Sequence, residues 1–237
     1  MCGFVGIYYK DNSSLDINKY KSILKSMIDV IVHRGPDDEG IFVSSNEKLG
    51  LAFKRLSIID LKKNANQPML SQNRDWIIVF NGEIYNFNIL RSSINSNKSF
   101  WKTSSDTEVV LEAITKYGFI EAIKKLNGMF AIAAYCFSKK TLWLARDKFG
   151  EKPLYYSHNV KEGLSFSSEI NPFFLLPTIK KQISGEAFSQ YLRYGYVPDP
   201  LAILKGVFKL KAGSILKFDK KKSIKEIKYW SSFETYH

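Results

Sequence analysis

The spacing of short apolar segments constrains the fold of this chain more than any other feature of its sequence. From residue 129 onward, four such segments follow one another at the spacing of β-hairpins: Met129–Phe137, Thr141–Ala145, Pro153–Ser157 and Leu164–Ser167. Groups of strand-like segments alternate with pairs of helix-like segments along the chain. This order predicts an α+β layered fold rather than a parallel sheet built from repeated strand–helix–strand units.

The first half of the chain contains three further strand candidates and two helix candidates. Strands are predicted over Gly3–Tyr9, Gly50–Ile59 and Asp75–Phe80, which are rich in Ile, Val, Leu and Phe. Ser105-Asp106-Thr107-Glu108 has the capping-box pattern and predicts a helix that closes at Gly118. An earlier amphipathic helix is predicted from the apolar residues that recur at helical spacing, namely Tyr20, Ile23, Leu24, Met27, Ile28 and Ile31.

The character of the sequence changes after about Pro177. Glu186–Tyr194 is a helix candidate, residues 197–200 form a rigid Pro-containing loop, and Lys211–Trp230 resembles a hairpin. Ser231–His237 is polar and aromatic and has the composition of the start of a linker.

Length and composition indicate one large domain without disulfides or a membrane span. The chain has 237 residues, of which 45% are hydrophobic, and these can bury a full core. The only cysteines, Cys2 and Cys136, cannot form a disulfide framework and lack the spacing of metal ligands. No signal pattern and no 18-residue apolar stretch is present. We therefore expect a cytoplasmic protein with no metal site and no membrane partner.

A net charge of +12 is typical of proteins that bind nucleic acids. The basic residues are mostly lysines spread along the whole chain, and the one local run is Lys220-Lys221-Lys222. No nucleic-acid-binding module accompanies them. The interpretation that the pattern favours is a solvated lysine surface with no nucleic-acid partner.

Cys2 becomes the first residue if Met1 is removed, and it then carries a thiol and a free α-amine on the same residue. The amine has a reference pKa of about 7.7 to 8.0, so it can accept a proton near neutral pH. The thiolate is the reactive form of cysteine, and a neighbouring base enlarges its fraction. Cys2 is therefore a candidate nucleophile that carries its own general base, although a lone second-position cysteine is weak evidence.

Polar residues cluster where three predicted elements begin or end. Asn81-Gly82, directly after the strand that is predicted to end at Phe80, could supply an amide side chain and an open backbone N–H to an oxyanion. Arg55 suits an α-carboxylate, and Asp106 suits an α-ammonium group. Each also has an ordinary structural interpretation, since Asn-Gly is a strong hairpin signal and the two charged residues are common at surfaces and helix starts.

A series of motifs, taken together, resembles the glutaminase domain of glutamine-hydrolysing asparagine synthetases. These domains are class II amidotransferases of the N-terminal-nucleophile hydrolase superfamily. The similarity covers essentially the whole chain, and its motifs occur in family order. The motifs are Met1-Cys2-Gly3-Phe4-Val5-Gly6-Ile7, His33-Arg34-Gly35-Pro36-Asp37, Arg55-Leu56-Ser57-Ile58-Ile59-Asp60, Gln67-Pro68-Met69, Asn81-Gly82-Glu83-Ile84-Tyr85-Asn86, Ser105-Asp106-Thr107-Glu108, Leu126–Ala131, Ala145-Arg146-Asp147 with Gly150, Lys152–Tyr156 and Phe166–Glu169.

The resemblance implies a four-layer αββα sandwich of two antiparallel sheets and a role for each matched residue. Cys2 would be the nucleophile, with its freed α-amine as the base, and Asn81 and Gly82 would form the oxyanion hole. The glutamine carboxylate would be held by Arg55 and the amino-acid end of glutamine by Asp106 and Glu83. The backbone of Leu56, Ser57, Ile58 and Ile59 would line the pocket.

The resemblance also implies a division of the chain and a partner. Residues 1–230 would form the type 2 amidotransferase domain, with a core over 2–180 and a C-terminal helix and hairpin over 181–230, and residues 231–237 would begin a linker. The Ser-Gly-Gly-x-Asp-Ser loop of the ATP-dependent half does not occur in the sequence. We therefore expect no cofactor in this chain, with ATP and Mg belonging to a synthetase domain supplied in cis or in trans, and we expect the chain to be a fragment or an isolated domain.

Three alternatives remain open from the sequence. In the complete enzyme the ammonia would amidate aspartate, or else a sugar acid or other carboxylate in surface-polysaccharide synthesis, a bacterial subset that Tyr194–Pro198 resembles. A retained Met1 would turn the base amine into an amide and leave an inactive interaction domain. The sequence also leaves open whether the chain forms a homodimer.

Overall fold

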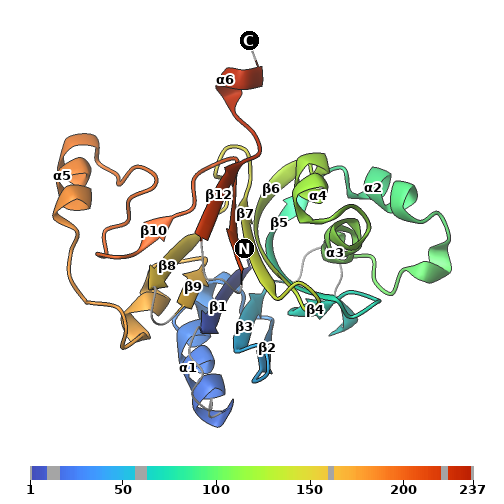
Figure 1. Cartoon of the computed structure of the whole chain (residues 1–237), viewed down its shortest axis with the longest axis horizontal. Coiled ribbons are helices and arrows are strands. Elements are labelled where there is room, and N and C mark those ends of the chain that lie inside the picture. The colour runs from blue at the N-terminus through green and yellow to red at the C-terminus, as the bar shows by residue number, and fades with distance from the viewer. Residues whose placement is uncertain (1, 10–16, 57–62, 160–162, 220–223, 236–237) are drawn as a thin grey trace.

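Two six-stranded antiparallel sheets stack face to face at the centre of the molecule (Figure 1). A computed structural model describes residues 2–9, 17–56, 63–159, 163–219 and 224–235. The first sheet has the order β10-β8-β9-β1-β3-β2, with β1 at Gly3–Tyr9, β2 at Asp38–Ser44, β3 at Leu49–Arg55, β8 at Tyr155–Asn159, β9 at Gly163–Ser167 and β10 at Phe208–Lys209. The second has the order β12-β11-β7-β6-β5-β4, with β4 at Met69–Leu70, β5 at Trp76–Ile84, β6 at Gly128–Cys136, β7 at Thr141–Arg146, β11 at Ser214–Phe218 and β12 at Ile224–Lys228.

Helices cover the outer faces of both sheets, which makes the α+β architecture a four-layer αββα sandwich. Helix α1 (Ile17–Asp29) packs on β1, β2 and β3, and helix α3 (Asp106–Tyr117) packs on β4 and β5. Beside α3 lie α2 (Phe87–Ile94) and α4 (Phe119–Lys125), whereas α5 (Gly185–Tyr194) and α6 (Ser232–Thr235) lie toward the periphery (Figure 1). Short 3₁₀ helices occupy Val32–Arg34, Lys63–Ala65, Lys98–Phe100 and Asn171–Leu175.

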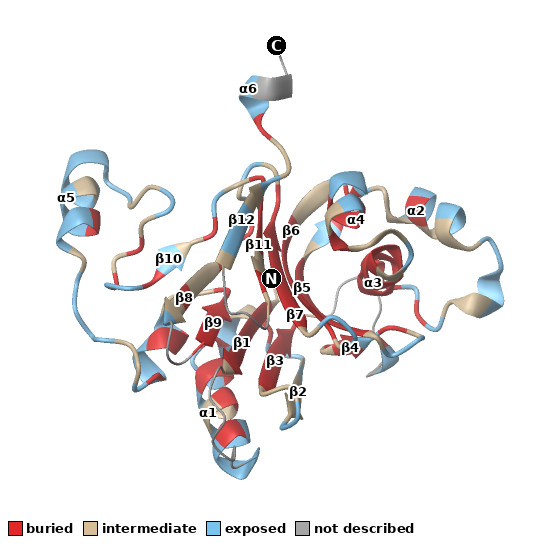
Figure 2. Cartoon of the chain, in the orientation of Figure 1, coloured by how far each residue is buried: buried red, intermediate tan, exposed pale blue. Residues whose placement is uncertain are grey.

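The central core lies between the sheets because side chains alternate sides along each strand. Phe4 and Tyr8 of β1 point into this layer together with Ile77 and Val79 of β5. Val5 and Ile7, which alternate with Phe4 and Tyr8 along β1, point outward and pack in the cluster that includes α1. Both faces of the central strands are therefore buried (Figure 2), which explains why these strands have nearly continuous apolar sequences.

Gly50 of β3 lets α1 approach its sheet closely. A Cβ atom at Gly50 would lie 2.5 Å from Leu24 Cδ1 and 2.8 Å from Tyr20 Cε1, both side chains of α1. The buried face of α1 contains Tyr20, Leu24, Met27 and Ile28, as the helical spacing predicted, whereas Ile31 is buried just beyond the helix.

The predicted helix at Ser105–Glu108 is confirmed, but its start is built differently from a capping box. The Ser105 hydroxyl accepts a hydrogen bond from the Thr107 N–H at 3.0 Å, and the helix ends at Gly118, whose φ is +79°. The Glu108 carboxylate reaches past Ser105 and accepts from the N–H groups of Lys102 and Thr103, at 2.9 and 2.8 Å. The preceding loop, rather than the cap residue, is therefore tied to Glu108.

The prediction that a strand ends at Phe80 and that Asn81-Gly82 follows it is wrong, and so is the hairpin alternative. Strand β5 continues to Ile84, and Asn81 and Gly82 pair with Ala131 and Phe130 of β6. Gly82 fits this position because a Cβ there would lie 2.2 Å from the Met129 carbonyl oxygen. The pairing with β6 thus overrides the turn preference of Asn-Gly.

The other predicted strands occur with small shifts in their ends. Strand β3 ends at Arg55 rather than at Ile59, and residues 57–62 lie outside the described part of the chain. The C-terminal helix and hairpin occur as α5 and the β11–β12 pair. The four residues of α6 occupy part of the segment that we interpreted as a linker, and the proposed division into residues 1–230 and 231–237 stays a prediction.

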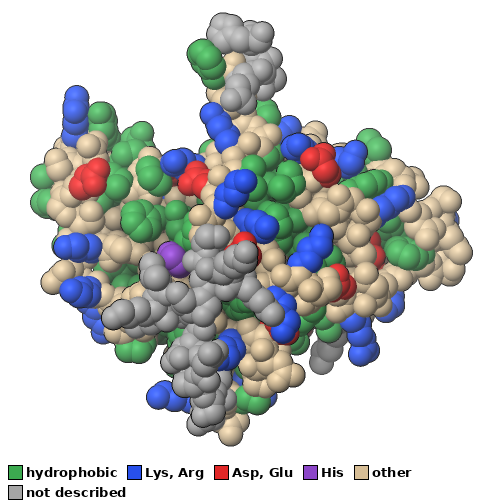
Figure 3. All heavy atoms as spheres, in the orientation of Figure 1, with side chains coloured by type: hydrophobic (Ala, Val, Ile, Leu, Met, Phe, Trp, Pro, Cys, Tyr) green, Lys and Arg blue, Asp and Glu red, His purple; other side chains and the backbone are tan. Residues whose placement is uncertain are grey.

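Lysine and arginine side chains are distributed across the molecular face seen in Figure 3. Within the residues that the structure describes, no helix is long and apolar enough to cross a membrane. The same residues contain no group of three or more His, Cys, Asp or Glu side chains arranged to hold a metal ion.

Candidate functional site

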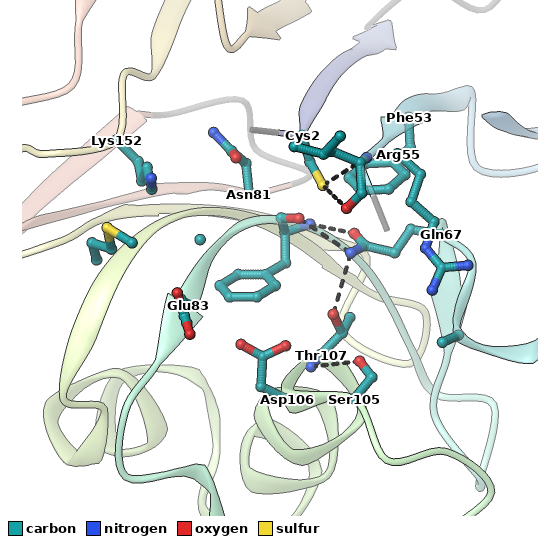
Figure 4. A pocket seen from close by; sticks show the side chains of 15 residues that line it. Cys2, Phe53, Arg55, Gln67, Asn81, Glu83, Ser105, Asp106, Thr107 and Lys152 are labelled. Atoms are coloured by element: carbon teal, nitrogen blue, oxygen red, sulfur yellow. Dashed lines mark hydrogen bonds between the residues drawn. The ribbon is translucent and has the colours of Figure 1, made fainter. Parts of the chain in front are cut away.

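A cavity of about 140 Å³ opens where the start of β1, the end of β3, the second half of β5 and the start of α3 meet (Figure 4). It brings together residues that are more than 100 positions apart in the chain. Its lining comprises Cys2, Phe53, Arg55, Leu56, Ala65, Gln67, Phe80, Asn81, Gly82, Glu83, Ser105, Asp106, Thr107, Met129 and Lys152. All of the predicted site residues that the structure describes are in this set. Ser57, Ile58 and Ile59 lie outside the described residues.

The Cys2 thiol lies against the main chain of Leu56, just past the end of β3. Its sulfur accepts a hydrogen bond from the Leu56 N–H at 3.4 Å and lies 3.6 Å from the Leu56 carbonyl oxygen. Burial raises the pKa of the Cys2 thiol, and the Leu56 N–H and the charge of Arg55 partly oppose this rise. The resting thiol is therefore protonated at neutral pH and needs a base to become a nucleophile.

The side chain of Arg34 holds the main chain of Cys2 through a hydrogen bond. Its Nε donates to the Cys2 carbonyl oxygen at 3.0 Å, and its Nη1 donates to Glu169 Oε1 at 2.9 Å. His33 Nε2 lies 2.8 Å from the same carboxylate oxygen. The turn that carries His33 and Arg34 thus fixes the residue that carries the thiol.

The same turn also fixes the end of β3 and with it Arg55. Asp37 donates its N–H to the Arg55 carbonyl oxygen at 3.0 Å. A Cβ at Gly35 would lie 2.5 Å from the carbonyl carbon of Lys54 and 2.6 Å from that of Arg55, so only glycine lets the turn pack this closely. Arg55 is 7% exposed and lines the cavity near the end of β3.

Asn81 places a side-chain amide at the cavity beside Cys2. The residue is 1% exposed, and its Nδ2 atom has no hydrogen-bond partner among the described residues. Figure 4 places the amide between the Cys2 sulfur and Lys152. A buried amide donor without a partner costs free energy, and a ligand acceptor in the cavity would remove that cost.

The direction of the Gly82 N–H follows from its neighbours in β5. The N–H groups of Phe80 and Ile84 donate away from β6, to Gln67 Oε1 at 2.6 Å and to Asp106 Oδ2 at 3.0 Å. Because main-chain donors alternate sides along a strand, the N–H of Gly82 points toward the same edge of β5. Asn81 and Gly82 therefore present two donors from consecutive residues.

Asp106 lies at the first turn of α3 and faces the cavity with Glu83. Burial, aided by the negative charge of Glu83, raises the pKa of Asp106 to about 6, although main-chain donors such as the Ile84 N–H partly oppose the shift. Asp106 is buried, whereas Glu83 is exposed at the cavity edge. The pair makes this end of the cavity acidic and suited to a cationic group.

Gln67 supports the site, although no role was assigned to it from the sequence. Its side-chain amide bonds to both main-chain groups of Phe80, accepting from the N–H at 2.6 Å and donating to the carbonyl at 3.1 Å. It also donates to Thr107 Oγ1 at 3.2 Å. Gln67 thereby extends the edge of β5 and ties it to α3. The only sequence signal was its place in the Gln67-Pro68-Met69 motif.

The chain is similar in sequence to known proteins of one family. A family model described as a glutamine amidotransferase domain matches residues 1–230. The chain is 38% identical over 214 residues to asparagine synthetase [glutamine-hydrolyzing] 1 of Bacillus subtilis, a match that covers 90% of this chain and 33% of that protein. It is 35% identical over 170 residues to asparagine synthetase B [glutamine-hydrolyzing] of Escherichia coli, which covers 72% of this chain and 29% of that protein. This chain thus matches about a third of the length of either relative.

Solved structures support the same fold at lower sequence identity. The glutamine phosphoribosylpyrophosphate amidotransferase of Bacillus subtilis superposes with a TM-score of 0.68 at 17% identity, over 98% of this chain and 50% of that one. At this identity the likeness concerns the fold alone, which this chain shares with that amidotransferase.

Proposed function

The chain belongs to the glutamine amidotransferase domain family, and we propose on that premise that it hydrolyses the side-chain amide of glutamine with Cys2 as nucleophile. The observation that carries the proposal is the joint lining of one cavity by the Cys2 thiol, the Asn81 amide, whose Nδ2 has no partner among the described residues, and the acidic start of α3. A thiol, two oxyanion donors and a binding site for an amino-acid head group are the parts that amide hydrolysis needs.

The first half of the reaction forms a thioester. After removal of Met1, the α-amine of Cys2 takes the thiol proton, and the sulfur attacks the side-chain carbonyl carbon of glutamine. The carbonyl π electrons move to oxygen, and the resulting anion accepts hydrogen bonds from Asn81 Nδ2 and the Gly82 N–H. When the carbonyl re-forms, the C–N bond breaks, the ammonium on Cys2 gives its proton to the leaving nitrogen, and ammonia departs.

The second half of the reaction repeats these steps with water. The α-amine of Cys2 removes a proton from water as the water oxygen attacks the thioester carbon. The same two donors stabilise the second tetrahedral anion. Its collapse breaks the C–S bond, the sulfur recovers a proton from the ammonium, and glutamate is released. The free thiol and amine are regenerated without any change in oxidation state.

Charge complementarity orients the substrate. The guanidinium of Arg55 pairs with the α-carboxylate of glutamine, and the carboxylates of Asp106 and Glu83 pair with its α-ammonium group. The main chain of Leu56 contacts the thiol and lines the same cavity.

The ammonia is used by a synthetase domain, in cis or in trans, that activates an acceptor carboxylate with ATP. Aspartate is the acceptor that we propose, because the two relatives described above are named asparagine synthetases.

Trapping the thioester tests the proposed reaction. The Met1-processed protein, mixed with glutamine and quenched in acid, is expected to gain the mass of one glutamyl group on the peptide that contains Cys2 and to release glutamate and ammonia in equal amounts. Protein that retains Met1 is the control, since its Cys2 nitrogen is an amide and cannot act as a base. If both forms hydrolyse glutamine at the same rate, the role of the α-amine is wrong.

The raised pKa of Asp106 predicts a pH dependence of glutamine binding. Asp106 is ionised above pH 6 and attracts the α-ammonium of glutamine, and below pH 6 it becomes protonated and loses that attraction. The dissociation constant is therefore expected to be about ten-fold higher at pH 5 than at pH 7. Calorimetry on the inactive Cys2→Ala variant measures binding without turnover.

Two variants test whether the pH dependence of glutamine binding comes from Asp106 rather than from another buried carboxylate of α3. Asp106→Asn is expected to bind glutamine weakly at both pH values. Glu112→Gln changes a carboxylate of the same helix that accepts from the Gln72 N–H, outside the cavity, and it should keep the wild-type pH profile. An affinity of the Cys2→Ala protein, with Asp106 intact, that does not change between pH 5 and pH 7 would contradict the assignment of Asp106.

A further inference from the structure

The loop after β7 is built around a buried carboxylate. Asp147 is fully buried, and its side chain accepts main-chain hydrogen bonds on both of its oxygens. The donors are the N–H groups of Phe130 at 3.1 Å, Phe149 at 3.1 Å, Glu151 at 2.9 Å and Lys152 at 2.9 Å. These bonds tie residues 149–152 to the start of β6, the strand that pairs with Asn81 and Gly82.

The side chain of Arg146 also forms hydrogen bonds to this loop. Its Nε donates to the Lys152 carbonyl oxygen at 2.9 Å, and its Nη2 donates to the Gly150 carbonyl oxygen at 2.6 Å. Its Nη1 donates to Asp199 Oδ2 and to the Leu210 carbonyl oxygen, both at 2.7 Å. Gly150, with a φ of +69°, lies where a Cβ would approach the guanidinium to 2.9 Å. The backbone of Lys152 is therefore held on both its N–H and its carbonyl.

This rigid loop presents Lys152 to the cavity that contains Cys2. Lys152 is 6% exposed and lines the cavity with Asn81 and Gly82. Figure 4 places its side chain on the far side of Asn81 from the Cys2 sulfur. Lysine is among the residues least often buried to this degree, because desolvation of its charge is costly. None of the roles proposed above involves the Arg146-Asp147 and Lys152-Pro153 motifs. Together these two motifs place the side chain of Lys152 at the cavity.

We propose that Lys152 is a further catalytic residue of the reaction, and that its ammonium group stabilises the negative oxygen held by Asn81 and Gly82. The inference rests on the proposed glutamine hydrolysis. A fixed positive charge beside an oxyanion lowers the energy of the tetrahedral state more than that of neutral glutamine, so it raises the turnover number. Because both tetrahedral states form at the same carbonyl carbon, Lys152 assists formation and hydrolysis of the thioester alike.

The position of Lys152 favours an effect on the negative oxygen of the tetrahedral state rather than on the Cys2 sulfur. Arg55 lowers the pKa of the Cys2 thiol, and its side chain lies on the Cys2 side of Asn81 (Figure 4). Lys152 lies on the opposite side of Asn81 from Cys2 in this view and lines the cavity together with Asn81 and Gly82. Loss of Lys152 should therefore slow turnover without changing the ionisation of the thiol.

Two substitutions test whether the charge of Lys152 is what matters. Lys152→Met keeps an unbranched apolar side chain and removes the charge, whereas Lys152→Arg keeps a cation. Lys148→Met removes a lysine of the same loop that does not line the cavity and serves as the matched control. For each Met1-processed protein we would measure kcat and KM for glutamine, the pH profile of Cys2 alkylation by iodoacetamide, and the melting temperature.

The expected result is a loss of kcat of about ten-fold or more in Lys152→Met, with little change in KM or in the alkylation midpoint. Lys152→Arg should recover most of the activity, and Lys148→Met should resemble the wild type. The proposal is overturned if Lys152→Met retains wild-type kcat, if its alkylation midpoint shifts together with kcat, or if Lys152→Arg is as slow as Lys152→Met. A wild-type protein that is alkylated at Cys2 but makes no glutamate would instead refute the glutamine hydrolysis itself, and with it the role of Lys152.

Discussion

Cys2→Ala is expected to reduce glutamine hydrolysis by the Met1-processed protein at least about 10⁴-fold. The variant keeps the α-amine base, the oxyanion donors and the charged residues of the cavity, but it has no atom that can form the thioester. Glutamate release measures the loss. Glutamine should still bind to the variant, because the groups that hold the head of the substrate are unchanged.

Cys136→Ala provides the matched control for the second thiol of the chain. Cys136 is buried in β6 and faces the layer between the second sheet and its helices, away from the cavity. Its loss is expected to lower stability somewhat and to leave kcat and KM unchanged. If Cys136→Ala abolished hydrolysis and Cys2→Ala did not, the proposed nucleophile would be wrong.

Asn81→Ala is expected to lower kcat by about 10²- to 10³-fold with little change in KM. The lost Nδ2 donor would bond to the oxyanion, which exists only after the thiol has attacked, so its removal raises the barrier without weakening ground-state binding. Steady-state kinetics on the Met1-processed variant, compared with the wild type at the same pH, measures kcat and KM separately.

Stability provides the control for the Asn81 variant. Since Asn81 Nδ2 has no hydrogen-bond partner among the described residues, its removal breaks no bond there, and the variant should melt close to the wild type. A variant that melts normally and turns over at the wild-type rate would remove Asn81 from the oxyanion hole. A rise in KM at constant kcat would assign Asn81 to substrate binding instead.

Local patterns in the sequence predicted the elements that carry the site. The apolar periodicity identified α1, the Ser105 cap and Gly118 bounded α3, and the strand after Cys2 followed from its continuous apolar residues. These features depend on interactions among residues a few positions apart, which is why they can be read from the chain. The resemblance then assigned roles to Cys2 and to Asn81.

Local preference was misleading at Asn81-Gly82. Asn-Gly favours a turn, yet both residues lie inside β5, because β6 pairs along the whole of that strand and Gly82 fits against the Met129 carbonyl. Pairing between strands depends on the register of two distant segments, and a single segment contains no information about it. The same pairing directs the Gly82 N–H toward the cavity.

The sequence by itself predicted the strand after Cys2, the helices α1 and α3, and the apolar face of α1, and it placed a thiol at the head of a buried strand. Only the tertiary structure decided that Gln67 supports the edge of β5 and that the Arg146–Asp147 loop turns Lys152 toward the same cavity as Cys2. The physical reason is that the cavity exists only where two sheets and the start of α3 pack together. Its geometry is set by packing between segments far apart in the chain, which no local pattern encodes.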